Sequence, residues 1–212
     1  MFSRLSVPEA DSRESEFTAY LSSSNIIDWH HPRVLTKAQQ LAHGLESPLA
    51  IAKACFEWVR DEIRHSVDYQ LNPVTCRASA VLEHKTGYCF AKSHLLAALL
   101  RANQIPAGFC YQRLSLNDQG APYSLHGLNA IHLPEFGWYR IDARGNKPGV
   151  EAKFTPPHEQ LAYEVRLPEE VDCLTIFPEP LHVVVEVLQT QNTWQGVFRN
   201  LPDLDLHSVA FT

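Results

Sequence analysis

The chain has 212 residues, of which 45% are hydrophobic and 20% are charged, and this composition excludes a fibrous or intrinsically disordered protein. The net charge of −6 and the pI of about 6.0 argue against a nucleic-acid-binding protein, because such proteins usually carry a basic excess that neutralises phosphates.

The cysteines and the N-terminal sequence indicate in which cellular compartment the protein is expected. Five cysteines are an odd number, and no two of them form a CxxC pair, so we expect reduced thiols and a cytoplasmic protein. The first residues, MFSRLSVPEADSRESEF, contain no apolar segment typical of a signal peptide. No apolar run approaches the roughly 18 residues that span a bilayer. We therefore expect neither membrane nor nucleic acid among the partners.

Helices are predicted in the first half of the chain, after 28 polar and mixed residues that suit a strand or a surface segment. Apolar residues recur there at i, i+3 and i+4 spacing, which is the period of a helix with one buried face. Ser47 followed by Pro48 is a typical helix start. The helix that begins at Cys89 has the widest apolar face and should be central. The predicted helices cover residues 36–44, 47–63, 79–85 and 89–103.

Strands are predicted in the second half, where short stretches rich in β-forming residues alternate with turn residues. A loop at Pro134–Gly137 suits a hairpin between the second and third of these strands. Helices first and an antiparallel sheet later indicate an α+β fold. The predicted strands are FCYQRL (109–114), HGLNAIHL (126–133), WYRIDA (138–143) and LHVVVEVL (181–188).

The chain contains no internal repeat or long linker, which favours one domain. We predict an N-terminal segment, residues 1–35, packed on a catalytic-type core at 36–149. Residues 150–212 are predicted to form a C-terminal extension with at least one strand, packed on the same domain. The sequence leaves the oligomeric state open, and it also leaves open whether the extension covers a cleft.

Cys89 stands where a loop becomes the central predicted helix. Only a thiolate attacks a carbonyl, and the unpaired N–H groups and dipole of a helix N-terminus favour a negative charge. The same N–H groups can hydrogen-bond an oxyanion formed on the attacked carbonyl. Cys89 is therefore a candidate nucleophile, with a small buried core residue as the alternative.

The predicted hairpin supplies a candidate base and acid. If Leu128 lies opposite Asp142, then His126 is a diagonal neighbour of Asp142 and within reach of a histidine–carboxylate hydrogen bond. A slip of one residue would turn Asp142 to the other face. In the assumed register, Asp142 would orient the imidazole and His126 would take the thiol proton. The alternative for Asp142 is a carboxylate that caps the turn after the strand.

Several nearby residues have weaker claims to a role. His132 shares the face of His126 but lies opposite Trp138 beside the hairpin loop, so both are interpreted as rim residues. Tyr88 is a further rim or oxyanion candidate. The Cys89 backbone N–H is expected to form one side of an oxyanion hole, with Tyr69 or Asn72 as candidates for the second donor; a turn before a proline is the alternative for both.

The sequence contains no convincing metal site. His30 and His31 are adjacent at a turn before proline and would rarely converge on one ion. Neither an HExxH motif nor a paired-cysteine spacing is present. We therefore expect no metal and no cofactor.

Two stretches, GYCFAKSHLLAALLRANQIPAGFCYQ and HGLNAIHLPEFGWYRID, resemble the transglutaminase-like superfamily. Its members share G-x-C, an apolar helix, G-I-P-A-R and a strand, followed by a strand beginning H-A-W and a closing G-W-x-x-x-D strand. The resemblance covers residues 50–149. It implies a papain-like α+β core, with the cysteine-headed helix packed on an antiparallel sheet. It also implies Cys89 as nucleophile, His126 as base and Asp142 as orienting acid.

This chain departs from the family pattern in ways that spare those three residues. Tyr88-Cys89-Phe90 replaces the Gln-Cys-Trp of eukaryotic transglutaminases, and Gly108 replaces the arginine of G-I-P-A-R. The chain is also short and has no EF-hand-like loop. These differences weaken the case for a protein glutamine as substrate.

The resemblance implies acyl transfer through a thioester on a peptide or protein amide. Attack of water on the thioester would make the protein a peptidase or amidase, which we favour, and attack of an amine would make it a transglutaminase. How the closed site excludes water decides between them, and the sequence does not fix this. A third hypothesis is a non-catalytic scaffold that binds a peptide or a partner protein.

Overall fold

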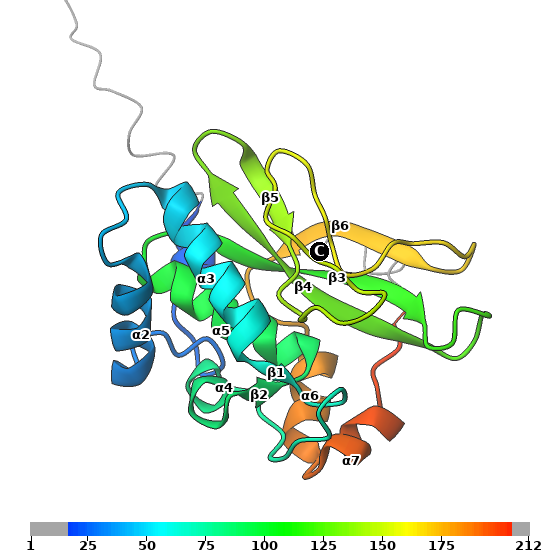
Figure 1. Ribbon diagram of the computed structural model, residues 1–212. Coiled ribbons are helices and arrows are strands. Elements are labelled where there is room, and N and C mark those ends of the chain that lie inside the picture. Colours follow the sequence, from blue (N-terminus) through cyan, green and yellow to red (C-terminus); the bar gives the residue numbers. More distant parts are fainter. Residues whose placement is uncertain (1–16, 205–212) are drawn as a thin grey trace, which may run out of the picture.

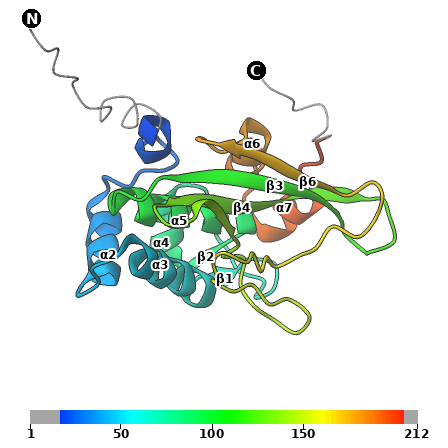
Figure 2. The same cartoon turned by 90° about the horizontal axis from the view of Figure 1, so that it is seen from above.

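The computed structural model describes residues 17–204 and has an α+β architecture, as predicted (Figure 1). The expectations for residues 1–16 lie outside the described part. Helices α2 to α5 pack on one face of a four-stranded antiparallel sheet, which Figure 2 shows nearly edge-on. These helices are α2 (Pro32–Ala42), α3 (Pro48–Glu62), α4 (Ala78–His84) and α5 (Cys89–Ala102).

The ends of the helices follow from local capping. The Ser47 hydroxyl accepts a hydrogen bond from the Ala50 N–H at 3.2 Å, and Pro48 occupies the first turn of α3. Helix α2 begins at Pro32, four residues earlier than predicted, because His31 and Pro32 repeat this arrangement. The α4 helix ends at Lys85, whose φ of 50° is left-handed.

Helix α5 is the centre of the core. Every residue from Cys89 to Arg101 is buried, so this helix is enclosed on all sides. Its first turn lies close to the sheet because Gly127 has no side chain, and a Cβ there would lie 2.8 Å from the ring of Phe90. The Asn129 amide spans the same interface, donating to the carbonyls of Ser93 and Gly108 at 3.1 Å each.

The main sheet has the strand order β5-β4-β3-β6, and all neighbouring strands are antiparallel. The pairing of Asn129 with Ile141 and of His132 with Trp138 confirms the register assumed for the hairpin. Extended by one residue, this register sets Asp142 opposite Leu128. The strands are β3 (Ala107–Ser115), β4 (Tyr123–Leu133), β5 (Gly137–Ile141) and β6 (Val171–Phe177).

The strand predicted at 181–188 is wrong: these residues belong to helix α6 (His182–Thr190). Its buried residues are Val184, Val187 and Leu188, at helical spacing. A short valine-rich run fits either period, and burial of one helical face outweighs β propensity here. The strand of this region is β6, an edge strand that pairs with β3 and exposes 76% of Leu174.

Two further features border the start of α5. The short strands β1 (Arg64–His65) and β2 (Thr86–Gly87) are parallel, and His65 pairs with Gly87, two residues before Cys89. Helix α7 (Trp194–Arg199) is attached to the same region, because the Tyr88 hydroxyl donates to the Trp194 carbonyl at 2.6 Å. The chain after α7 then follows β4, where the Leu125 N–H donates to the Pro202 carbonyl at 2.8 Å.

None of the helices found between residues 17 and 204 combines the length and the apolar character needed to cross a membrane. All five cysteines are free thiols.

Candidate active site

Cys89 is the first residue of α5 and is 7% exposed. The preceding residue, Tyr88, has extended backbone angles and makes no side-chain cap. The N-cap residue therefore leaves the N–H groups of the first turn without a side-chain cap. Positive charge from these groups and from the helix dipole favours an anion at the thiol or beside it.

His126 and Asp142 form a buried hydrogen-bonded pair. The Nε2 atom of His126, on β4, lies 2.7 Å from Oδ2 of Asp142, which directly follows β5. Backbone N–H groups of Ala162 and Arg144 each donate to the same carboxylate at 3.0 Å. Burial opposes ionisation, but the charge of His126 and these hydrogen bonds outweigh it, so the pKa of Asp142 lies below its usual value.

With Nε2 bound to Asp142, Nδ1 is the nitrogen of His126 left for Cys89. Burial of the imidazole lowers its pKa, but the charges of Asp142 and Cys89 and hydrogen bonds to both outweigh burial and raise the pKa to about 10. The imidazole also makes an edge-to-face contact with Tyr163, at 5.0 Å between ring centroids. The raised pKa suits an imidazole that stays protonated in the site.

Cys89 and His126 line one cleft of about 420 Å³. One part of its wall is apolar and comes from several elements, including the C-terminal segment. The lining also carries charged side chains, among them those from the loops that follow β1 and β5. The apolar lining includes Val67, Leu114, Leu116, Leu125, Phe198 and Leu201, and the charged lining includes Asp68, Arg144 and Lys147.

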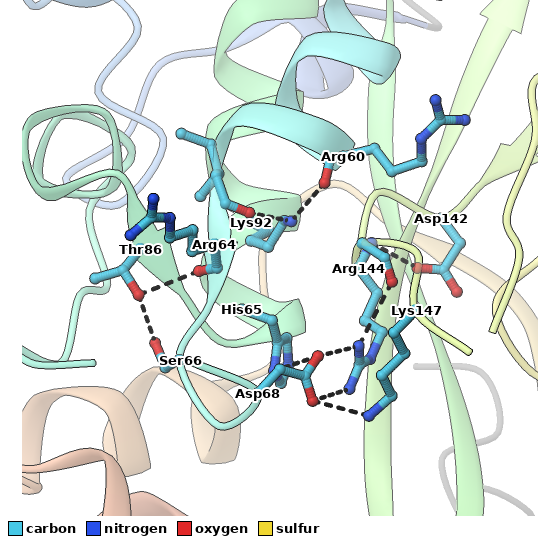
Figure 3. A network of polar contacts seen from close by, with 12 residues as sticks. Arg60, Arg64, His65, Ser66, Asp68, Thr86, Lys92, Asp142, Arg144 and Lys147 are labelled. Carbon is cyan, nitrogen blue, oxygen red and sulfur yellow. Dashed lines mark hydrogen bonds and ion pairs between the residues drawn. The ribbon is translucent and has the colours of Figure 1, made fainter. Parts of the chain in front are cut away.

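The charged side chains form a network beside the cleft (Figure 3). Asp68 binds both terminal nitrogens of Arg144, one of them at 3.0 Å, and Nζ of Lys147 at 2.8 Å. Burial raises the pKa of Asp68, but its hydrogen bonds to Arg144 and Lys147 outweigh this and lower it to about 2. Because the Arg144 N–H also binds Asp142, this network fixes the loop that orients the acid.

Lys92 lies one turn beyond Cys89 on α5 and is fully buried. Its ammonium donates to the carbonyls of Arg60, at 3.1 Å, and of Ile63, both at the end of α3. Burial and then the charge of Arg144 lower its pKa to about 7. Lys92 was not predicted as a functional residue, although a lysine within the apolar run FAKSHLLAALL was a signal.

The remaining predicted candidates are distributed over different places. Tyr88 lines the cleft, with its hydroxyl bound to α7. Tyr69 is 58% exposed, and Asn72 accepts the Trp194 N–H at 2.8 Å; neither lines the cleft. His132 and Trp138 lie 5.6 Å apart between ring centroids, next to the hairpin loop and away from the cleft lining.

His65, which was not among the predicted site residues, lines the cleft from β1. Its signal in the sequence, one histidine after an apolar helix, was too weak to distinguish it from a surface residue. Among residues 17–204, no group of three or more histidine, cysteine, aspartate or glutamate side chains is arranged to hold a metal ion.

Comparison with solved structures finds the same fold. A candidate cysteine protease from Cytophaga hutchinsonii matches with a TM-score of 0.50 and 19% identity, over 61% of this chain and 42% of that chain. The periplasmic domain of TgpA from Pseudomonas aeruginosa matches with a TM-score of 0.43 and 23% identity, over 58% of this chain and 45% of that chain. The matched regions are thus less than half of either solved chain. A comparison with curated proteins finds no match.

A family model described as the transglutaminase-like superfamily matches residues 36–143, just over half of the chain. The matched range includes Cys89 at the start of α5, His126 on β4 and Asp142 after β5. The chain therefore belongs to the transglutaminase-like superfamily.

Proposed function

We propose that the protein is a cysteine-dependent acyl-transfer enzyme that acts on peptide or protein amides, with Cys89 as nucleophile, His126 as acid and base, and Asp142 as orienting acid. The observation that carries this proposal is the buried His126–Asp142 pair, at 2.7 Å, beside a cysteine that begins a helix in the same cleft. A core cysteine would need none of these neighbours.

In the proposed reaction, the Cys89 thiolate attacks the amide carbonyl and forms a tetrahedral oxyanion. Imidazolium His126 then gives its proton to the nitrogen of the leaving amine as the C–N bond breaks, which leaves a thioester and a neutral imidazole. In the second half, His126 takes a proton from water as the oxygen attacks the thioester. Collapse releases the carboxylic acid and restores the thiolate–imidazolium pair.

We propose hydrolysis over transamidation. The charged wall of Asp68, Arg144 and Lys147 supports this choice, because such groups keep water in the cleft and water competes for the thioester. Transamidation to a primary amine is the second candidate, and a non-catalytic peptide-binding scaffold is the third. The five free thiols support a reducing compartment, for which we propose the cytoplasm.

The first experiment is limited alkylation with iodoacetamide, read by peptide mass spectrometry. We expect fast labelling at Cys89 that falls at least tenfold in His126→Ala and is unchanged in Cys173→Ser, a matched thiol change on β6. Slow labelling spread over all five cysteines would favour the scaffold.

The second experiment separates the two reactions. A peptide amide library is incubated with the enzyme and a labelled primary amine. Release of acid and amine by the wild type, lost in Cys89→Ser, supports the hydrolase. Incorporation of the labelled amine at a comparable rate would replace it with the transamidase.

A further inference from the structure

His65 is the remaining cleft histidine to which the proposed mechanism assigns no role. It is 7% exposed, belongs to β1 and lines the same cleft as Cys89 and His126. Its pairing with Gly87 sets it beside the two residues that lead into α5. Its ring also contacts the ring of Tyr88 edge-on, at 5.6 Å between centroids. His65 therefore lies next to the segment that presents the Cys89 N–H.

The ring nitrogens of His65 make no hydrogen bond to any residue that the structure describes. Nδ1 is fully enclosed and without a partner, 3.7 Å from Oδ2 of Asp68, which is beyond hydrogen-bond distance. Asp68 is instead occupied by Arg144 and Lys147, as Figure 3 shows. Nε2 is not among the enclosed, partnerless atoms, so it is the nitrogen with access to the cleft. A buried ring nitrogen without a partner is uncommon, which distinguishes His65 from an ordinary packing residue, and Nε2 is the ring nitrogen that a ligand in the cleft can reach.

The imidazole of His65 is neutral at physiological pH. Burial, and next the positive charge of Arg144, hold its pKa well below the usual value, and these effects outweigh the charge of Asp68. Nδ1 is enclosed and has no acceptor within hydrogen-bond distance, since Asp68 Oδ2 lies 3.7 Å away, and a buried N–H without an acceptor is costly; we therefore assign the lone pair to Nδ1. The proton then resides on Nε2, which makes this atom a hydrogen-bond donor toward the cleft.

We propose that Nε2–H of His65 is the second donor of the oxyanion hole, opposite the Cys89 backbone N–H. This rests on the proposed acyl-transfer function. Three other donors of the cleft are already engaged, the Tyr88 hydroxyl by the Trp194 carbonyl and the cations of Arg144 and Lys147 by Asp68. A neutral donor suits this role, because it stabilises the oxyanion without competing with the thiolate–imidazolium pair.

The test uses two reagents that react with the same sulfur. The sulfur of Cys89 adds to the carbonyl of a peptide aldehyde and gives a hemithioacetal whose oxygen occupies the oxyanion hole. Iodoacetamide alkylates the same sulfur without forming an oxyanion. His65→Phe keeps the ring and removes the donor. Its kcat/KM should fall roughly 100-fold, in line with the loss of one oxyanion donor, with most of the loss in kcat. Aldehyde affinity should fall similarly, while the alkylation rate stays within twofold of the wild type.

Two variants serve as comparisons. His65→Gln, which can return an N–H donor, should recover at least tenfold of the lost kcat/KM. His182→Phe changes an exposed histidine of α6 and should behave as the wild type. Far-UV circular dichroism and the thermal midpoint show whether each variant is folded, and aldehyde affinity and alkylation are compared only at temperatures where it is.

Several outcomes would overturn the assignment. Unchanged aldehyde affinity in His65→Phe would do so, as would an equal loss of alkylation, which would mean that His65 acts on the thiol rather than on the oxyanion. If the wild type neither binds the aldehyde nor shows His126-dependent alkylation, the acyl-transfer function itself fails. If the wild type binds the aldehyde and shows His126-dependent alkylation, but His65→Phe keeps its aldehyde affinity and kcat/KM, only the role of His65 is refuted.

Discussion

The imidazole of His126 and the carboxylate of Asp142 lie 2.7 Å apart, although the two residues are 16 positions apart in the sequence. The β4–β5 pairing creates this contact, because its register carries the end of β5 back toward His126. The carboxylate is held by two backbone N–H groups as well, so the imidazole meets an acceptor that is already fixed in place.

Replacing Asp142 by asparagine should abolish most of the activity while the fold persists. An amide can donate to Nε2 and would stabilise the wrong imidazole tautomer, for which a loss of about 10⁴ in kcat is expected. Steady-state kinetics of Asp142→Asn measure this loss. Asp61→Asn, at an exposed ion pair with Arg60, serves as control and should stay within twofold. A loss below tenfold in Asp142→Asn would contradict the orienting role.

The charge state of His126 predicts the alkaline limit of catalysis. The pKa of His126 is raised to about 10, so the proton needed by the leaving amine is lost as pH rises through that value. Amide cleavage should therefore decline near pH 10, while alkylation of Cys89, which needs no acid, should not decline with it. Parallel pH profiles of both reactions check this. A cleavage rate that still rises above pH 10 would contradict the proton-donor role.

The raised pKa of His126 also predicts how the stability of the fold depends on pH. A raised pKa means that the folded state holds a proton that the unfolded state releases above about 6.5. The stabilisation is complete below that pH and is lost as pH rises through about 10. Urea unfolding of wild type and His126→Gln at pH 6, 8 and 10 should show a difference in unfolding free energy that shrinks with pH. A constant difference would show that His126 is not protonated in the fold.

Lys92 should give a pH dependence of opposite sign. Its pKa is lowered to about 7, so between pH 7 and roughly 10 the unfolded state binds the proton more tightly, and stability rises with pH. Lys92→Met keeps the length of the side chain and removes this rise. It also leaves the Arg60 and Ile63 carbonyls without their donor, which costs roughly 1–3 kcal/mol. Urea unfolding across pH 7 to 10 measures both effects. If the unfolding free energy of Lys92→Met rises with pH as steeply as that of the wild type, the lowered pKa of Lys92 is refuted.

Gly127 is predicted to set the distance between β4 and the start of α5. A Cβ at this position would lie 2.8 Å from the Phe90 ring, next to Cys89, so Gly127→Ala should destabilise the fold by roughly 1–3 kcal/mol and lower kcat. Gly196→Ala is the control, because its nearest neighbour is the end of the flexible Gln191 side chain. Thermal unfolding and kinetics compare the two. Equal effects would remove the case for a special packing role at Gly127.

Much of the arrangement was predictable because local patterns carry it. The central helix was predicted from its apolar face and its start from the transition at Cys89. The hairpin register was assumed, because a period of two gives the faces of β4 and β5 and not their alignment, and the strand pairing then confirmed it. The strand assigned to 181–188 was wrong because three consecutive valines suit either period, and only packing selects one. The division at residues 35 and 149, like the catalytic roles of Cys89, His126 and Asp142, stays a prediction for experiment.

By itself, the sequence determined that Cys89 begins a helix and that His126 lies on one face of a strand. These features follow from helical and strand periods, which are visible over a few neighbouring residues. Only the tertiary structure decided which groups share an environment. Lys92 on α5, and His65 and Asp68 at β1 and in the loop after it, acquire their partners, or lack them, through burial and charges contributed by segments distant in the sequence. Charge interactions and desolvation depend on distances through space, and these distances cannot be read from spacing along the chain.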